Sequence, residues 1–282
     1  MEPLNKTNYL NLAGYILNTL VTFAASPIFG FPDNAQLSRK YQTLVTPSGL
    51  TFAIWGIIFL AQGIFTVVQM LPAYRANKLV QHGVSYLYFA ACVAQSIWTF
   101  VFGYEIIWSS FIVMGAILAS LVYIVWRLSK MEHDRKEFWL FKFPFSIHCG
   151  WIAAAFAVNV NAFIVAAGGG RVALISWAYL TLLWAILVAV FALVYLRSPD
   201  YTIAGVLIWA TIGIASELND PLDGIAAVFT QNEISAIRNA VIAVSALVGV
   251  ATAGFAGFRI VKGRDVRELP EDEEIAYEGH TM

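Results

Sequence analysis

The chain has 282 residues, of which 59% are hydrophobic and only 12% are charged, with a net charge of −1 at pH 7 and a mean hydropathy of +0.70. Soluble domains carry roughly a quarter charged residues, because a surface in contact with water must be largely polar. The composition therefore excludes an ordinary soluble protein and indicates lipid as the solvent, and the near-neutral charge gives no reason to expect nucleic acid as a partner.

Apolar runs of about 18 or more residues are typical of membrane-spanning helices, and the chain contains eight such runs, of which the seventh is the shortest. Strands of a membrane barrel would alternate apolar and polar residues, and these runs do not. The first run is longer than the apolar part of a secretory signal, so we expect it to be retained as a helix. The predicted fold is an all-α, polytopic transmembrane bundle with spans at residues 8–30, 49–71, 84–103, 106–126, 144–167, 173–196, 201–216 and 236–258.

The second span begins within the stretch "TPSGLTFAIWGIIF", residues 46–59. Pro47 suits a helix start, where a missing N–H group costs nothing, and Thr46 or Ser48 can cap the free amides. Trp55 then lies about 10 Å inside the helix, deeper than the interfacial belt in which membrane tryptophans usually sit. Trp55, Phe59 and Gly63 recur every four residues, so they share one helix face, which we expect to point into the bundle.

Polar residues at a similar depth predict a pocket inside the bundle, because polar side chains in hydrocarbon turn inward and find partners there. Trp151, Ala155 and Asn159 share one face of the fifth span. Each amide taken alone is more often a contact between helices than a ligand contact, but together with the aromatic rings they favour a slot for a flat, apolar ligand. The predicted ligand-binding residues are Trp55, Phe59, Gln95, Trp98, His148, Trp151 and Asn159.

The glycine run Gly168–Gly170 predicts a turn after the fifth span and divides the chain. We expect a five-helix membrane core over residues 1–170, three additional helices over 171–258 and a polar, disordered tail over 259–282. Cys92 and Cys149 fall in apolar spans and are expected to be packed thiols, and the sequence has no cysteine–histidine spacing that would predict a metal site.

The basic residues are distributed unevenly between the two sides of the predicted bundle. Thirteen of the 17 Lys and Arg residues fall on the side of the N-terminus and four on the other side. Cytoplasmic segments of membrane proteins are enriched in Lys and Arg, so we expect both termini to face the cytoplasm.

Several motifs resemble the translocator protein family (TspO/MBR, the tryptophan-rich sensory proteins). In "TPSGLTFAIWGIIFLAQG", Pro47 stands eight residues before Trp55, as in the family's second helix, and Phe59 and Gly63 follow at the family's spacing. The stretch "SIWTFVFGYEIIW" is similar to the family's hairpin between helices three and four, and "PFSIHCGWIAAAFAVNVNA" resembles its fifth helix, with Trp151 and Asn159 eight residues apart. The motifs cover about residues 8–167 and are closest to long members that carry extra helices.

The resemblance implies a five-helix bundle whose inner pocket is closed by the loop between helices one and two, here residues 31–45. This chain departs from the family pattern at two places. Around Gly49 a second Trp and Pro of the family are replaced, and in helix three the family's Asn–Trp pair appears as Gln95 and Trp98. It implies a porphyrin or haem-like molecule as a ligand rather than as a firm cofactor. The partners we expect are the lipid bilayer and a lipophilic small molecule, and a homodimer is an allowed assembly.

Three functions remain open at this stage, in order of preference. The first is a sensor or carrier that binds a tetrapyrrole, a sterol or an isoprenoid-like molecule. The second is a membrane enzyme acting on a lipid or isoprenoid with the acids near Glu217 and Asp220; but Pro221 adjoins these acids, water can reach them and no nucleophile–base arrangement accompanies them, so no catalytic residue is predicted. The third is a proton-coupled transporter that uses His148, although a lone buried histidine is more often structural.

Overall fold

The computed structural model describes residues 3–265, and in this part of the chain every regular element is a helix. Each of the eight predicted spans is present as a helix. They are α1 (Lys6–Phe29), α3 (Ile54–Val68) with the preceding 3-10 turn η1 (Gly49–Ala53), α4 (Leu87–Gly103), α5 (Ile107–Ser129), α7 (Phe143–Ala166), α8 (Arg171–Val190) with the π-helical turn η4 (Phe191–Tyr195), α9 (Tyr201–Glu217) and α11 (Gln231–Asp265).

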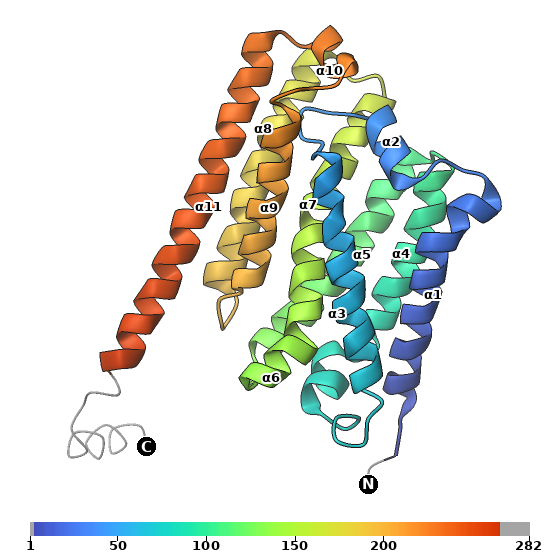
Figure 1. Ribbon diagram of the computed structural model, residues 1–282, viewed down its shortest axis with the longest axis vertical. Helices are drawn as coiled ribbons and strands as arrows, with labels where there is room; N and C mark the ends of the chain where they lie inside the picture. The colour runs from blue at the N-terminus through green and yellow to red at the C-terminus, as the bar shows by residue number, and fades with distance from the viewer. Residues whose placement is uncertain (1–2, 266–282) are drawn as a thin grey trace.

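Short helical elements occupy the connections between the long helices. Figure 1 shows α2 (Asn34–Lys40) and α10 (Asp223–Val228) at one end of the bundle and α6 (Arg135–Glu137) at the other. The π-helical turns η2 (Leu79–Val84) and η3 (Phe138–Lys142) precede α4 and α7. The predicted polar tail begins at residue 259, but α11 continues as a helix to Asp265, and residues 266–282 lie outside the described part of the chain.

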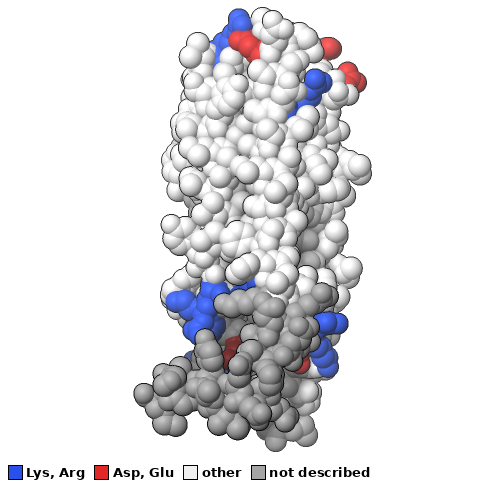
Figure 2. Space-filling model, turned by 90° about the vertical axis from the view of Figure 1, so that its left-hand side faces the viewer, with Lys and Arg blue, Asp and Glu red and all other residues white. Residues whose placement is uncertain are grey.

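Six helical segments in the described part are long and apolar enough to cross a membrane, while α4 and α9 are shorter apolar helices. Lys, Arg, Asp and Glu gather near the two ends of the face shown in Figure 2, and a band without them lies between. Large apolar side chains on the outside of the helices are exposed, among them Leu20, Leu60 and Val250. These features are those of a protein whose middle is surrounded by lipid, so the protein is an integral, multi-pass membrane protein.

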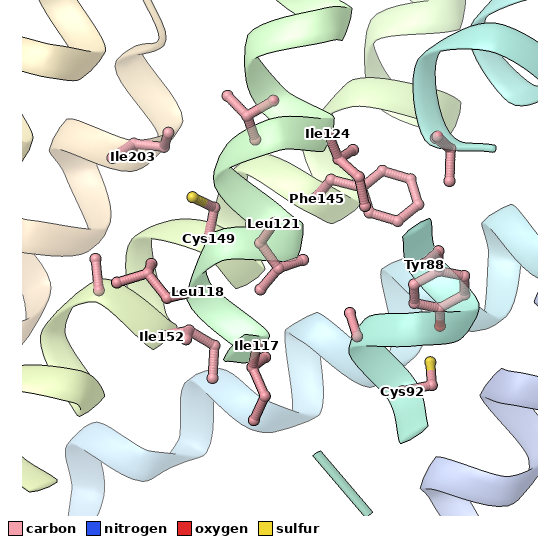
Figure 3. Packing of buried hydrophobic residues seen from close by; sticks show 14 of the residues in the cluster. Tyr88, Cys92, Ile117, Leu118, Leu121, Ile124, Phe145, Cys149, Ile152 and Ile203 are labelled. Carbon is pink, nitrogen blue, oxygen red and sulfur yellow. The ribbon is translucent and has the colours of Figure 1, made fainter. Parts of the chain in front are cut away.

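The helices form two packed groups. The larger apolar core joins α4, α5 and α7, and Figure 3 shows Tyr88, Leu121 and Phe145 within it. A second apolar core joins α8, α9 and α11 and includes Leu44 and Val45 from the segment after α2. A smaller cluster connects the two groups through residues of α3, α7 and α9.

Helix α7 lies at the centre and is buried without interruption from Pro144 to Ala153. Four of its polar side chains bond to partners on other elements, as polar groups in an apolar environment require. The bonds are Ser146 Oγ to Asp200 Oδ2 at 2.5 Å, Gln62 Nε2 to His148 Nδ1 at 2.8 Å, Ser110 Oγ to Asn159 Oδ1 at 2.7 Å and Asn161 Nδ2 to Thr181 Oγ1 at 2.8 Å. The first and the last of these bonds connect α7 to the second group of helices. His148 Nε2 and the Trp151 indole nitrogen, by contrast, have no partner among the described residues.

The start of the second span is held tightly against α9. The Ser48 N–H donates to the Gly213 carbonyl at 3.0 Å, and the Trp209 indole N–H donates to the Thr51 carbonyl at 3.0 Å. A Cβ atom on Gly213 would lie 2.0 Å from Thr51 Oγ1 and 2.9 Å from Thr51 Cβ. Because Thr51 Cβ is itself too close, rotation of the Thr51 side chain could not relieve the clash, and only glycine fits here.

We therefore predict that Gly213→Ala separates α9 from η1 and lowers the free energy of unfolding by about 1–3 kcal/mol, the usual cost of overpacking. Gly205→Ala on the same helix is the matched control, because no atom lies within 4 Å of the added Cβ. Thermal melting of both variants in the same detergent tests the prediction. Equal melting temperatures for the two variants would show that the α9–η1 contact is not tight in solution.

Candidate ligand-binding site

The candidate site is a cavity of about 90 Å³ at the junction of the two helix groups. Its walls come from α3 and α7, from α4 and α5, and from α8 and α9, and the segment before η1 closes it on one side. None of the lining residues in the described part of the chain carries a full charge. The cavity is therefore suited to an apolar body and offers it only neutral polar groups.

Four of the seven predicted site residues line this cavity, namely Trp55, Trp98, Trp151 and Asn159. The rings of Trp55 and Trp151 lie 6.3 Å apart in an edge-to-face arrangement, and Phe52 packs edge-on against Trp151 at 5.6 Å. Trp98 stacks on Phe102, with ring centroids 4.9 Å apart. The structure thus brings aromatic residues of the second and fifth spans together on one cavity wall, where the rings of Trp55 and Trp151 contact each other.

Trp98 and Trp151 each hold an indole N–H that has no hydrogen-bond partner among the described residues. Both side chains are almost fully buried, with exposed fractions of 7% and 2%. A buried donor without a partner costs free energy, and buried Trp N–H groups usually find an acceptor. Two residues of the cavity wall therefore carry buried donors that have no acceptor among the described residues.

The other three predicted residues do not line the cavity. Phe59 packs against Phe23 of α1 with ring centroids 5.2 Å apart, and the Gln95 Oε1 atom is buried without a partner in the described residues. His148 lies beneath the slot, with its ring centroid 5.7 Å from that of Trp55. Gln62 accepts a hydrogen bond from the Tyr88 hydroxyl and donates to His148 Nδ1, an arrangement that leaves the proton of the neutral imidazole on Nε2.

Residues of α8 and α9 also line the cavity, and the sequence patterns did not assign them to the site. Thr181, Trp184 and Ala185 on α8 fall at positions i, i+3 and i+4, so they share one helix face. Trp184 is not among the predicted site residues, but it lines the cavity while its indole N–H donates to the Ala153 carbonyl at 2.9 Å. The small and polar residues on this face of α8 were the sequence feature that could have assigned the helix to the site.

The loop between the first two spans covers the cavity, as the family resemblance implied. We call residues 31–45 the lid segment; it contains α2, and Asn34, Ser38 and Tyr41 line the cavity. Three consecutive lid side chains donate to carboxylates at the ends of other helices. Lys40 and Tyr41 bond to Glu105 between α4 and α5, and the Gln42 amide donates to Glu217 Oε1 of α9 at 2.7 Å.

The bonds from Lys40 and Tyr41 hold the pKa of Glu105 below its usual value of 4.5, because both groups stabilise the ionised carboxylate. The same contact with Glu105, together with partial burial, raises the pKa of Tyr41 to about 12. The ionised form of Glu105 therefore holds the lid segment against the hairpin between α4 and α5.

Comparison with known families agrees with the motifs of the sequence. The model of a family described as TSPO-like protein matches residues 8–254. The match covers the five helices whose motifs carry the resemblance and continues through α8 and α9 into α11. Searches of curated proteins and of solved structures found no match.

We predict that Glu105→Gln loosens the lid segment, because the variant loses the charge that Lys40 and Tyr41 bind. Backbone amide exchange over residues 34–41 should become faster, and the rest of the bundle should be unchanged. Because the pKa of Glu105 is lowered in the folded state, its stabilising contribution is present above pH 4.5 and is lost as the pH falls through the lowered pKa.

The exposed Glu132 lies between α5 and α6, and Figure 1 shows α6 at the end of the bundle opposite α2. The control variant Glu132→Gln should therefore exchange like the unaltered protein over residues 34–41. Equal exchange in the Glu105 and Glu132 variants would mean that other contacts hold the lid segment.

Proposed function

The chain belongs to the TSPO-like protein family, and from this premise we propose that it binds a flat, lipophilic ligand in the cavity beneath the lid segment, as a sensor or a carrier. The observation that carries this proposal is the cavity itself, in which Trp55 and Trp151 form an edge-to-face pair beside two indole N–H groups without partners. Tetrapyrroles, sterols and isoprenoid-like molecules are the candidate ligand classes.

The proposal includes a movement of the lid segment. The cavity volume of about 90 Å³ is smaller than the roughly 300–1,000 Å³ of typical small-molecule sites. A flat ring system would therefore enter as the lid segment moves outward and the side chains on the walls change rotamer. Loops that cover ligand sites commonly move in this way during binding.

Both parts of the molecule contribute to the proposed site. Leu207 and Thr211 of α9 lie on its wall together with Trp151 of α7. We therefore propose that the three later helices belong to the functional unit and are more than a cover for the five-helix core.

We predict that Trp55→Phe and Trp151→Phe each weaken ligand binding by about threefold to tenfold, because stacked aromatic pairs contribute about 0.5–1.5 kcal/mol beyond the area that they bury. Trp151→Phe should show the larger loss for ligands with an acceptor atom, because it also removes a donor. Titration of the purified protein with porphyrins, sterols and isoprenoids, read by tryptophan fluorescence, provides the measurement.

The controls are Trp108→Phe and Trp177→Phe, because neither side chain lines the cavity and both are exposed to the surroundings of the bundle. Their ligand affinities should equal that of the unaltered protein, and thermal melting checks that all four variants fold. If the two control variants lose binding while Trp55→Phe and Trp151→Phe keep it, the ligand occupies another place.

We also propose that both termini face the cytoplasm, from the excess of Lys and Arg at the end of the bundle where α1 begins. Single cysteines test this, because the native Cys92 and Cys149 are buried. Ala227→Cys on α10 should react with a membrane-impermeant maleimide in intact cells, and Arg135→Cys on α6 should react only after lysis. The reverse pattern would invert the orientation.

A further inference from the structure

A second cavity of about 190 Å³ adjoins the first, between the lid segment and the end of α9. The two cavities share Ser38, Thr46, Pro47 and Phe52 in their walls. Since the same side chains line both, only this layer separates them. A single molecule could therefore occupy the two cavities when the lid segment moves.

The two cavities differ in chemistry. The first is lined by aromatic, aliphatic and neutral polar residues, whereas the wall of the second includes Arg39, Gln42 and Glu217. An apolar space joined to a smaller set of charged and hydrogen-bonding groups matches a molecule with an apolar body and a polar head.

The charged group that is best placed to bind such a head is Glu217. Its side chain is partly buried, and the Gln42 amide holds Oε1 at 2.7 Å. Among the described residues Glu217 forms no ion pair. Arg39 belongs to the same cavity but is exposed, so water already solvates its guanidinium group. A charge that is partly removed from water gains more from a counter-charge than a hydrated one does.

We propose that the second cavity is a subsite for a cationic head, and that the ligand of this protein is a lipophilic amine whose ring system occupies the first cavity. The protonated amine lies against Glu217, which Gln42 holds in place. The flat body lies against Trp55 and Trp151, so this inference rests on the proposed function. It adds the charge of the ligand and a specificity-determining residue, Glu217, from the helices beyond the five-helix core.

This assignment disfavours a ligand that carries carboxylate groups. Carboxylates in the first cavity would be buried without a counter-charge, because no lining residue there is charged. A carboxylate in the second cavity would meet Arg39 but would lie in the same small space as Glu217. Two negative charges in one small cavity repel each other, so an anionic head is the less favourable occupant.

Three acridines with one ring skeleton test the proposal on the full-length protein in detergent. 9-(Aminomethyl)acridine carries a protonated amine outside its ring system at neutral pH, 9-methylacridine is neutral, and acridine-9-carboxylate is an anion. We expect the amine to bind about twofold to fivefold more tightly than 9-methylacridine, the range for a partly exposed charge pair, and the carboxylate to bind most weakly. Glu217→Gln keeps an acceptor for Gln42, so it should fold normally and bind the neutral probe as before, but it should lose the preference for the amine.

Asp223→Asn is the matched control, because Asp223 is an exposed acid near Glu217 in the chain but does not line either cavity. This variant should keep the full preference. Loss of the preference in both variants would reduce the effect to the general charge of this end of the molecule and overturn the subsite.

Three further outcomes decide between this inference and the proposed function. If 9-methylacridine binds in a way that depends on Trp55 and Trp151 but the amine brings no gain, the cationic subsite is wrong and the aromatic site stands. If the carboxylate binds most tightly and Arg39→Gln abolishes that binding, the second cavity selects anions. If none of the acridines binds, both the subsite and the aromatic site are overturned.

Discussion

The structure depends on one constraint, the burial of α7 at the junction of the two helix groups, where every residue from Pro144 to Ala153 is buried. Polar side chains on such a helix have little access to solvent, so they need partners on neighbouring helices. Ser146, His148, Asn159 and Asn161 meet this need with partners before α9, on α3, on α5 and on α8. Because lipid provides little hydrophobic drive for helix association, such pairs and close packing specify which helices adjoin α7. The cavity lies where this polar pairing gives way to aromatic side chains.

The helices of the membrane region could be predicted from the sequence, because the property that places a helix in lipid is local. Each span is a continuous apolar run, and its ends are marked by residues such as Pro47 and the Gly168–Gly170 turn. The inward orientation of Trp55, Trp151 and Asn159 followed from their four-residue spacing and their depth. The covering position of the lid segment came instead from the family resemblance, since nothing in its own residues requires α2 to lie above a cavity.

The contribution of α8 and α9 to the site could not be predicted in the same way. The Gln42–Glu217 bond joins residues 175 positions apart, and the clash that only Gly213 avoids depends on the position of Thr51 in a different helix group. Contacts of this kind leave no periodic pattern along the chain. The hydropathy of α8 and α9 indicated membrane helices but left open which side faces α7. For this reason Trp184 was not among the predicted site residues, although it lines the cavity.

The division of the cavity wall between two helix groups has a consequence for the lifetime of the protein. A molecule bound there would contact both groups and raise the free energy of unfolding. Once its free concentration exceeds the dissociation constant, this gain grows with the logarithm of the concentration. Spontaneous separation of α8, α9 and α11 from α7 would then be rarer in the occupied protein. Since cellular proteases remove chains that open, the amount of this protein in the membrane would rise and fall with the supply of its ligand.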